Sequence, residues 1–451
     1  MDALMTDAAR RGGRYVEGLS TRRLYPSREA VERLQELDRP LQDESIDPHE
    51  VLETLDVLGS PATVASPSGR YFGFVIGGTL PVARAANVLA GAWDQNAAIH
   101  ASSPVGSVLE EVCRKWLLSI FGLPRDAGVG FVSGATMGSF SGLAAARHAL
   151  LREAGWDVES RGLFGAPPIA VVVGEQAHAS IFKALSMLGM GRDRVVRVPA
   201  DDQGRMRAGL LPDISGLTIL CVGAGNVNSG AFDPIEEICA VAKSNGAWVH
   251  VDGAFGLWAA ASPERAHLVA GIEEADSWSV DAHKWLNVPY DSGMAIVRDA
   301  ADLRAAMSIS ASYYIEAGER DPWDWVPQIS RRARGVEIWA ALRSLGRRGV
   351  AELVERSCRH ATRFGEAMAA AGYQVLNDVV LNQVLVSFGD EDTTNRVLRR
   401  IQEDGTCWCG GGVWRGQAVM RISVSCWATT EEDVERSLDA ILRIAAEERK
   451  R

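Results

Sequence analysis

Residues 248–285, WVHVDGAFGLWAAASPERAHLVAGIEEADSWSVDAHKW, place one carboxylate and one lysine at the ends of two predicted strands. Asp252 closes the apolar run WVHV, and Lys284 follows the run SWSVDAH. In an open α/β sheet the carboxyl ends of the strands face the ligand crevice, so an acid and an amine can meet at one small molecule. Taken singly, each residue has a plainer interpretation: Asp252 as a strand-end cap and Lys284 as a surface charge.

The identity of the amine adds information, because only five of the 47 basic residues are lysines. Arginine stays protonated in proteins, whereas lysine can lose its proton and attack a carbonyl. Pyridoxal 5'-phosphate (PLP) needs such an amine to form a Schiff base, and a carboxylate to keep its pyridine nitrogen protonated. The pair Asp252 and Lys284 therefore indicates a PLP site.

The segments VDGAFG (251–256) and SVDAHKWLNVP (279–289) resemble the group II PLP-dependent decarboxylases, which include the aromatic-L-amino-acid, glutamate and histidine decarboxylases. The resemblance extends over nearly the whole chain. It implies that Asp252 holds the pyridine nitrogen beside the small residue Ala254, and that Lys284, preceded by His283, carries the cofactor. It further implies a homodimer with the α/β fold of the PLP-dependent transferases, fold type I.

The phosphate of the cofactor has a candidate site in SGATMGS, residues 133–139, between an apolar strand and a helix. Small residues let backbone N–H groups approach an anion, and a helix N-terminus adds about half a positive charge. A turn of this kind also occurs for close packing alone. The match to the family's SGGTEAN-like segment implies that Ala135 and Thr136 contact the phosphate, while Met137 replaces the family's glutamate.

Four further residues match family positions less directly. A histidine such as His178, after a strand and before a helix, is more often structural, but the family's QAHSS segment implies that it stacks on the cofactor ring. Asn226 stands where the family has a threonine that supports the cofactor. Arg421 matches an arginine that holds the substrate carboxylate in some members. Asp281 replaces an asparagine of the best-known members, and we expect it to orient His283 or a donor near Lys284.

The substrate is expected to contact the segment SGRYFGFVIGGTLP, residues 68–81, through Phe72 and Phe74. These residues favour an apolar or aromatic amino acid, since Arg70 is the only cation in the segment. The expected reaction removes the α-carboxylate of an L-amino acid and gives an amine and CO2.

The residue that returns a proton to Cα is left open by the sequence. In aromatic amino acid decarboxylases a loop tyrosine has this role, and the matching position here is Pro322. Tyr313 and Tyr314 lie nearby, and a packing role for both is equally compatible with the sequence. Oxidative decarboxylation and deamination to an aldehyde therefore stays an alternative. A retro-aldol carbon–carbon lyase would use the same cofactor and is a second alternative.

The pattern along the chain predicts three parts: a helical N-terminal segment (1–70), a large PLP-binding domain (71–335) and a small α+β C-terminal domain (336–451). Strand-like runs alternate with helical stretches in the second part, which predicts a mainly parallel sheet. The seven predicted strands are GVGFVSG, PIAVVVG, RVVRVPA, TILCVGAG, AWVHVDG, SWSVDA and GMAIVRD.

Composition excludes several classes of protein. A net charge of −11 over 451 residues argues against a nucleic-acid partner. The cluster Arg331, Arg332 and Arg334 is therefore expected to be solvated or ion-paired. No apolar run is long enough to span a membrane, and the N-terminus lacks a secretory core. Seven scattered cysteines suit the cytoplasm, and Cys407 and Cys409 lack neighbours with ligand spacing, so we expect no metal site.

Overall fold

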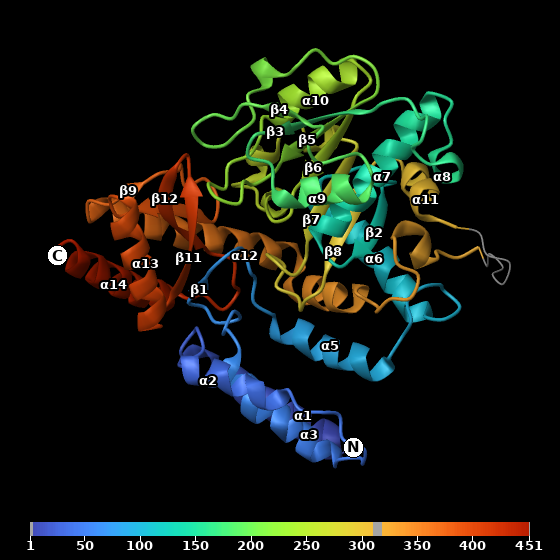
Figure 1. Ribbon diagram of the computed structural model, residues 1–451. Helices are drawn as coiled ribbons and strands as arrows, with labels where there is room; N and C mark the ends of the chain where they lie inside the picture. Colours follow the sequence, from blue (N-terminus) through green and yellow to red (C-terminus); the bar gives the residue numbers. More distant parts are fainter. Residues whose placement is uncertain (1–2, 310–317, 451) are drawn as a thin grey trace.

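The structure, a computed structural model, describes residues 3–309 and 318–450, and its large domain is built on a seven-stranded sheet (Figure 1). The strand order is β2-β8-β7-β6-β5-β3-β4. All neighbours run parallel except β8, which is antiparallel to both β2 and β7. The predicted mainly parallel sheet and its seven strands are confirmed. The strands are β2 Gly128–Val132, β3 Ala170–Gly174, β4 Val196–Val198, β5 Thr218–Gly223, β6 Trp248–Asp252, β7 Ser277–Asp281 and β8 Gly293–Val297.

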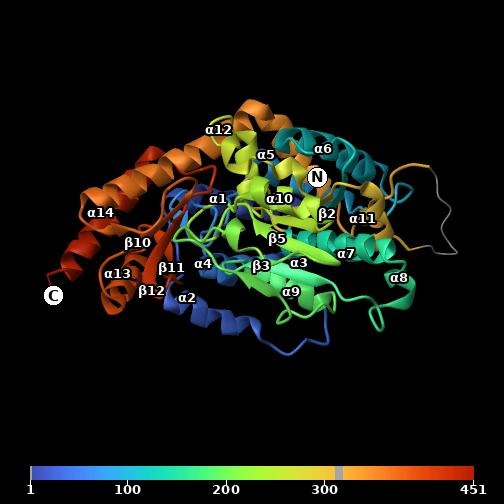
Figure 2. The ribbon, with the colours of Figure 1, turned by 90° about the horizontal axis from the view of Figure 1, so that it is seen from above.

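Helices cover both faces of this sheet, because side chains alternate along each strand. Val172 and Leu220 pack on one face, and Val173 and Ile219 on the other. Figure 2 shows α6 and α12 on one side of the sheet and α7 and α9 on the other. The first face is covered by α6 Pro104–Phe121, α10 Ile235–Ser244 and α12 Gly335–Ala370, and the second by α7 Ala135–Glu153, α9 Ala179–Met187 and α11 Ala300–Met307. The short helix α8 Val158–Arg161 follows α7, and α5 Pro81–Trp93 precedes α6.

The small domain has a five-stranded sheet in the order β1-β11-β12-β10-β9. Its first strand pairs in parallel with β11, so that Tyr71 lies opposite Trp408. The expected domain boundary at residue 71 is therefore wrong for these two residues, because their backbone hydrogen bonds join them to the small sheet. The elements are β1 Tyr71–Phe72, β9 Gln374–Val375, β10 Gln383–Ser387, β11 Trp408–Trp414, β12 Gln417–Ser423, α13 Glu391–Asp404 and α14 Glu431–Glu448.

Helix α12 connects the two domains and contains one break. Gly346 has φ +61° and ψ 178°, a conformation that glycine adopts without steric cost. The helix therefore consists of two parts. The first part and the start of the second, through Val350 and Leu353, pack in the large-domain core. The end of the second part packs, through Phe364 and Met368, in the core of the small domain.

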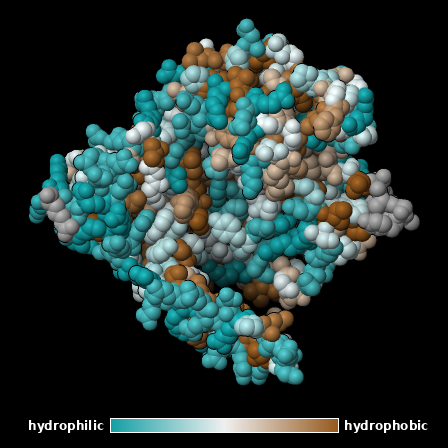
Figure 3. Space-filling view, in the orientation of Figure 1, coloured by the Kyte–Doolittle hydropathy of each residue, from teal (hydrophilic) through white to brown (hydrophobic). Residues whose placement is uncertain are grey.

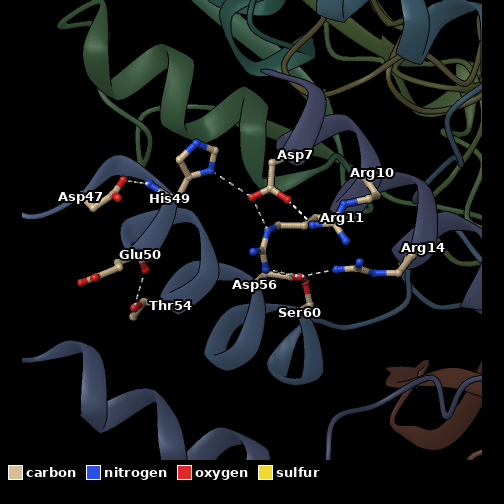
Figure 4. A network of polar contacts seen from close by, with 10 residues as sticks. All are labelled: Asp7, Arg10, Arg11, Arg14, Asp47, His49, Glu50, Thr54, Asp56 and Ser60. Atoms are coloured by element: carbon tan, nitrogen blue, oxygen red, sulfur yellow. Dashed lines mark hydrogen bonds and ion pairs between the residues drawn. The ribbon is translucent and has the colours of Figure 1, made fainter. Parts of the chain in front are cut away.

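The N-terminal segment is helical, as predicted, and lies apart from the main body in Figure 1. Polar contacts shown in Figure 4 join α1 to α3 and to the turn that follows it: His49 lies 3.6 Å from Asp7, and Arg11 donates to both Asp7 and Asp56. Hydrogen bonds from Arg10 and Arg11 lower the pKa of Asp7 to about 2. The helices are α1 Ala3–Glu17, α2 Arg28–Glu32, α3 Pro48–Thr54 and α4 Ser60–Ala62.

The described residues contain neither a candidate membrane span nor a candidate metal cluster. No helix there is both long and apolar enough to cross a membrane. Likewise, residues 3–309 and 318–450 contain no group of three or more His, Cys, Asp or Glu side chains placed to hold a metal ion. Cys407 and Cys409 are both buried in the small domain.

Candidate active site

A cavity lies at the carboxyl ends of the central parallel strands. The last residues of β5 and β6, Gly223 and Asp252, are register partners and both line it. The chain after β7 adds a further wall. The cavity brings together five of the residues predicted from the sequence, namely His178, Asn226, Asp252, Ala254 and Lys284.

Asp252 is held at the end of β6 by two hydrogen bonds. Its Oδ1 accepts from the backbone N–H of Ala254 at 3.2 Å, and its Oδ2 accepts from the Ser180 hydroxyl at 3.5 Å. Ser180 also lies 2.8 Å from His178 Nδ1. Ser180 was not predicted as a site residue, although it lies only two residues after His178, in the first turn of α9.

His178 caps α9 through its ring. Its Nδ1 accepts from the backbone N–H of Ser180 at 3.2 Å, so a neutral ring carries its proton on Nε2. Because Nδ1 is fixed in this way, the orientation of the imidazole is set by the start of the helix. The predicted histidine therefore has a capping role in the fold in addition to its place in the cavity.

Lys284 follows the end of β7 by three residues and remains 22% exposed. Its Nζ lies 3.1 Å from Asp281 Oδ2. The backbone of Gly77 approaches so closely that a Cβ there would lie 1.7 Å from the Lys284 carbonyl oxygen. The segment before α5 is thus packed against the lysine, and any larger residue at position 77 would push the two apart.

The predicted phosphate contacts lie at the start of α7. Ala135 is its first helical residue, and its N–H donates to Asp281 Oδ1 at 2.5 Å. His283 Nε2 lies 3.7 Å from the same oxygen, while His283 Nδ1 accepts from the Ser292 N–H. Burial lowers the pKa of His283, and the charge of Asp281 opposes that shift. Asp281 therefore contacts both His283 and Lys284, as the sequence suggested. Thr136 follows Ala135 in the same helical turn.

Asn226 and Arg421 meet at the loop after β5. The amide oxygen of Asn226 accepts from the backbone of Asn228 at 2.9 Å, so this side chain shapes the loop. Arg421 donates to the carbonyl oxygen of Val227 and to the Asn228 side chain. Burial lowers the pKa of Arg421, and its Nε is a buried donor without a partner among the described residues. Arg421 is not itself a lining residue of the cavity, whereas Val227 is.

The two phenylalanines expected at the substrate have different environments. Phe72 is fully buried in the small-domain core, in edge contact with Phe364. It is therefore a core residue, and its expected substrate contact is wrong. Successive strand residues point to opposite faces, and β1 turns Phe72 inward. Phe74 is 56% exposed and stacks on Trp408.

The loop expected to supply the proton is only partly described. Tyr313 and Tyr314 lie outside the described residues. Pro322 is buried at the start of a 3-10 turn, Pro322–Trp325, whose Trp323 N–H donates to the carbonyl oxygen of Ala98. The side chain of Pro322 has no acidic proton and cannot protonate Cα.

Three features of the site suit PLP. The Lys284 amine suits its aldehyde, the Asp252 carboxylate in the same cavity suits its pyridine nitrogen, and the N-terminus of α7 suits its phosphate. The fold and these residues therefore define a PLP-dependent enzyme of fold type I. Residues 35–389 match the family model described as the pyridoxal-dependent decarboxylase conserved domain. The chain belongs to this family, PLP is its cofactor, and it is a PLP-dependent carboxy-lyase.

Individual proteins agree with this assignment. A tyrosine decarboxylase of Papaver somniferum is 28% identical over 377 residues, covering 74% of this chain and 72% of the relative. The crystal structure of Oryza sativa TDC with PLP and tryptamine has a TM-score of 0.90 at 22% identity, covering 99% of this chain and 97% of that one. A 4-hydroxyphenylacetaldehyde synthase structure from Rhodiola rosea has a TM-score of 0.85 at 21% identity, covering 100% and 99%.

Proposed function

We propose that this protein removes the α-carboxylate of an apolar or aromatic L-amino acid and releases the amine and CO2. The observation that carries the proposal is the meeting of Asp252 and Lys284 in one cavity. Bound PLP supplies an electron sink for the pair left behind when CO2 departs. Side chains of this protein bind and orient the cofactor and the substrate.

In this proposal Lys284 binds the aldehyde of the cofactor, and Asp252 keeps the pyridine nitrogen protonated. A carboxylate favours a nearby cation, and the hydrogen bonds from Ala254 and Ser180 keep that carboxylate in place. His178 lies over the ring. The remaining cofactor contacts are proposed for Ala135, Thr136, His283 and Asn226.

Arg421 is proposed to bind the substrate carboxylate. A buried guanidinium with an unpartnered Nε is a ready donor for a carboxylate, with which arginine forms paired hydrogen bonds. Arg421 already bonds to the carbonyl oxygen of Val227, a residue that lines the cavity.

The preference for an apolar substrate rests on Arg70 and Phe74. Arg70 is only 1% exposed and is bound to the carbonyl oxygens of Ser20 and Thr406, with Asp433 3.6 Å away. It is therefore not free to pair with an acidic side chain of a substrate. Phe74 is an exposed aromatic ring in the same segment.

Formation of an aldehyde is the second candidate. Pro322 stands at the position of the loop tyrosine, and proline has no proton to give. The fold is also shared with an aldehyde synthase. Decarboxylation stays the first candidate, because His178 carries a proton on Nε2 in its neutral form, within the cavity.

The test is a panel of L-amino acids (tryptophan, tyrosine, phenylalanine, leucine, glutamate and cysteine sulfinate) with CO2, amine, aldehyde and peroxide measured in the same samples. We expect CO2 and amine in equal amounts from an aromatic or apolar substrate. Lys284→Ala is the control for background release. Equal amounts of aldehyde and peroxide would replace the first candidate with the second, and release from glutamate alone would refute the substrate preference.

We also propose that the protein is a homodimer. The N-terminal segment and α5 leave several large apolar side chains exposed, and contiguous apolar surface on a folded protein marks an interface. Hydrophobic side chains are visible on the N-terminal helices in Figure 3. The exposed members are Val31, Leu37, Leu41, Ile46, Val51, Leu55, Val57, Val82, Val88, Leu89 and Trp93.

A further inference from the structure

The carboxylate of Asp281 lies where the phosphate of the cofactor is expected. Its Oδ1 accepts from the N–H of Ala135, and its Oδ2 lies 3.1 Å from Lys284 Nζ. The N–H groups in the first turn of a helix have no partner inside the helix, which is why they bind phosphate and carboxylate alike. At the start of α7 the chain already supplies an anion of its own.

Little space is left around this carboxylate. A Cβ on Gly134 would lie 3.2 Å from Asp281 Oδ1, and a Cβ on Gly293 would lie 3.1 Å from it. The backbone N–H of Asp281 is also fixed, because it donates to the Ala254 carbonyl oxygen at 2.9 Å. A phosphate that reached the Ala135 N–H would therefore come close to a carboxylate that is 3% exposed.

The phosphate and the Asp281 carboxylate would repel each other, because both are negatively charged. Two like charges this close repel each other strongly in a partly buried site. Lys284 lies close enough to offset part of this repulsion. Burial lowers the pKa of His283 and so favours its neutral ring, and Tyr290, whose ring is 4.3 Å from His283, brings no charge. The Ala135 N–H can bond well to only one of the two anions.

We propose that Asp281 sets the affinity for PLP by competing with its phosphate for the start of α7. The inference rests on the proposed phosphate position at Ala135. Binding of the cofactor displaces the Asp281 carboxylate from the Ala135 N–H. Removing the charge at position 281 should therefore strengthen the binding of phosphate-bearing ligands in particular.

The experiment compares wild type with Asp281→Asn, in the full-length protein freed of cofactor. PLP affinity is measured by absorbance titration, and inorganic phosphate and pyridoxal, which lacks the phosphate, serve as separate probes. We expect Asp281→Asn to bind PLP and phosphate at least about tenfold more tightly, from relief of part of the repulsion, and to change pyridoxal affinity much less. Asp281→Ser, which also removes the charge, guards against a folding defect in one variant.

The matched control is Glu274→Gln. Glu274 precedes β7, whereas Asp281 ends it, so the control removes one negative charge at the opposite end of the same strand. Unchanged or weaker PLP binding in both folded Asp281 variants would overturn the inference. An equal increase in affinity for pyridoxal and for PLP would also overturn the inference, because the substitution would then act through Lys284 and not through the phosphate. Tight PLP binding without CO2 release would instead contradict the proposed function.

Discussion

Ser180 shows how single residues prepare the cavity before any ligand enters. Its hydroxyl lies between His178 Nδ1 and Asp252 Oδ2, while its N–H is capped by the same histidine. Ser180 thus joins Asp252, which is proposed to contact the pyridine nitrogen, to His178, which is proposed to lie over the cofactor ring. A shift of α9 would move both groups.

The first residue-scale prediction concerns Asp252→Asn. We expect this variant to keep PLP bound and to lose at least about a hundredfold in turnover, because an amide cannot stabilise a protonated pyridine nitrogen. Steady-state CO2 release measures the turnover, and the cofactor absorbance of the same sample measures the bound PLP. Ser180→Ala is the comparison, since it keeps the charge and removes only the hydroxyl that contacts His178 and Asp252. Turnover like that of wild type in Asp252→Asn would remove the residue from its proposed role.

The second residue-scale prediction concerns Lys284→Ala. The variant should lack the absorbance band of a lysine-bound cofactor, and borohydride should leave no PLP attached to the protein, since no other lysine lines the cavity among the described residues. Mass spectrometry after reduction measures the attachment. Lys183→Ala, on α9, is the matched control and should retain the bond. A reducible bond in Lys284→Ala would contradict the assignment.

At the scale of elements, a buried ion pair helps to fasten α6 to the sheet that presents the site. The arginine cluster after the loop is ion-paired, as the sequence indicated: Arg331 to Glu110, Arg332 to Glu337 and Arg334 to Asp291. Arg331 and Glu110 are each 1% exposed. Arg331 also donates to the Phe131 carbonyl oxygen at 2.7 Å and so joins α6 to β2.

The prediction at this scale is that Arg331→Ala lowers the free energy of unfolding by about 3–5 kcal/mol, because it leaves the Glu110 carboxylate buried and unpaired. Urea denaturation of the holoenzyme measures it. Arg363→Ala breaks the exposed pair with Glu435 and should cost less than about 1 kcal/mol. Equal losses in the two variants would show that burial of the pair is unimportant.

At the scale of the whole molecule, the N-terminal segment makes few buried apolar contacts with the rest of the chain. Its buried contacts are Leu19, Leu24 and Ala65, which pack with Trp408 of the small domain. Several other apolar side chains of the segment, such as Leu41 and Leu55, are exposed, as are Val88 and Leu89 of α5. A second copy of the chain would cover this surface.

We therefore expect a homodimer in solution, measured by light scattering. Leu89→Asp, on α5, should weaken dimerisation by placing a charge in an apolar interface. Phe164→Asp is the matched control: Phe164 is 99% exposed, lies outside the surface defined above and should not affect assembly. An active wild-type monomer, or equal effects of the two substitutions, would argue against this interface.

The sequence alone determined the family, the cofactor and the seven strands of the mainly parallel large-domain sheet. Strands can be predicted from local sequence, because they are short apolar runs that alternate with helical patterns. Asp252 and Lys284 were predictable because each ends or follows such a run, and the ends of parallel strands meet at one edge.

Only the tertiary structure decided how the remaining residues are used. Phe72 packs in a core and β1 joins the small sheet, because pairing with β11 depends on residues more than 330 positions away. The contact between Asp281 and Ala135 spans 146 positions, and that between Ser180 and Asp252 spans 72. No local pattern specifies such contacts, since they arise when separate strand ends and helix starts are brought together by packing.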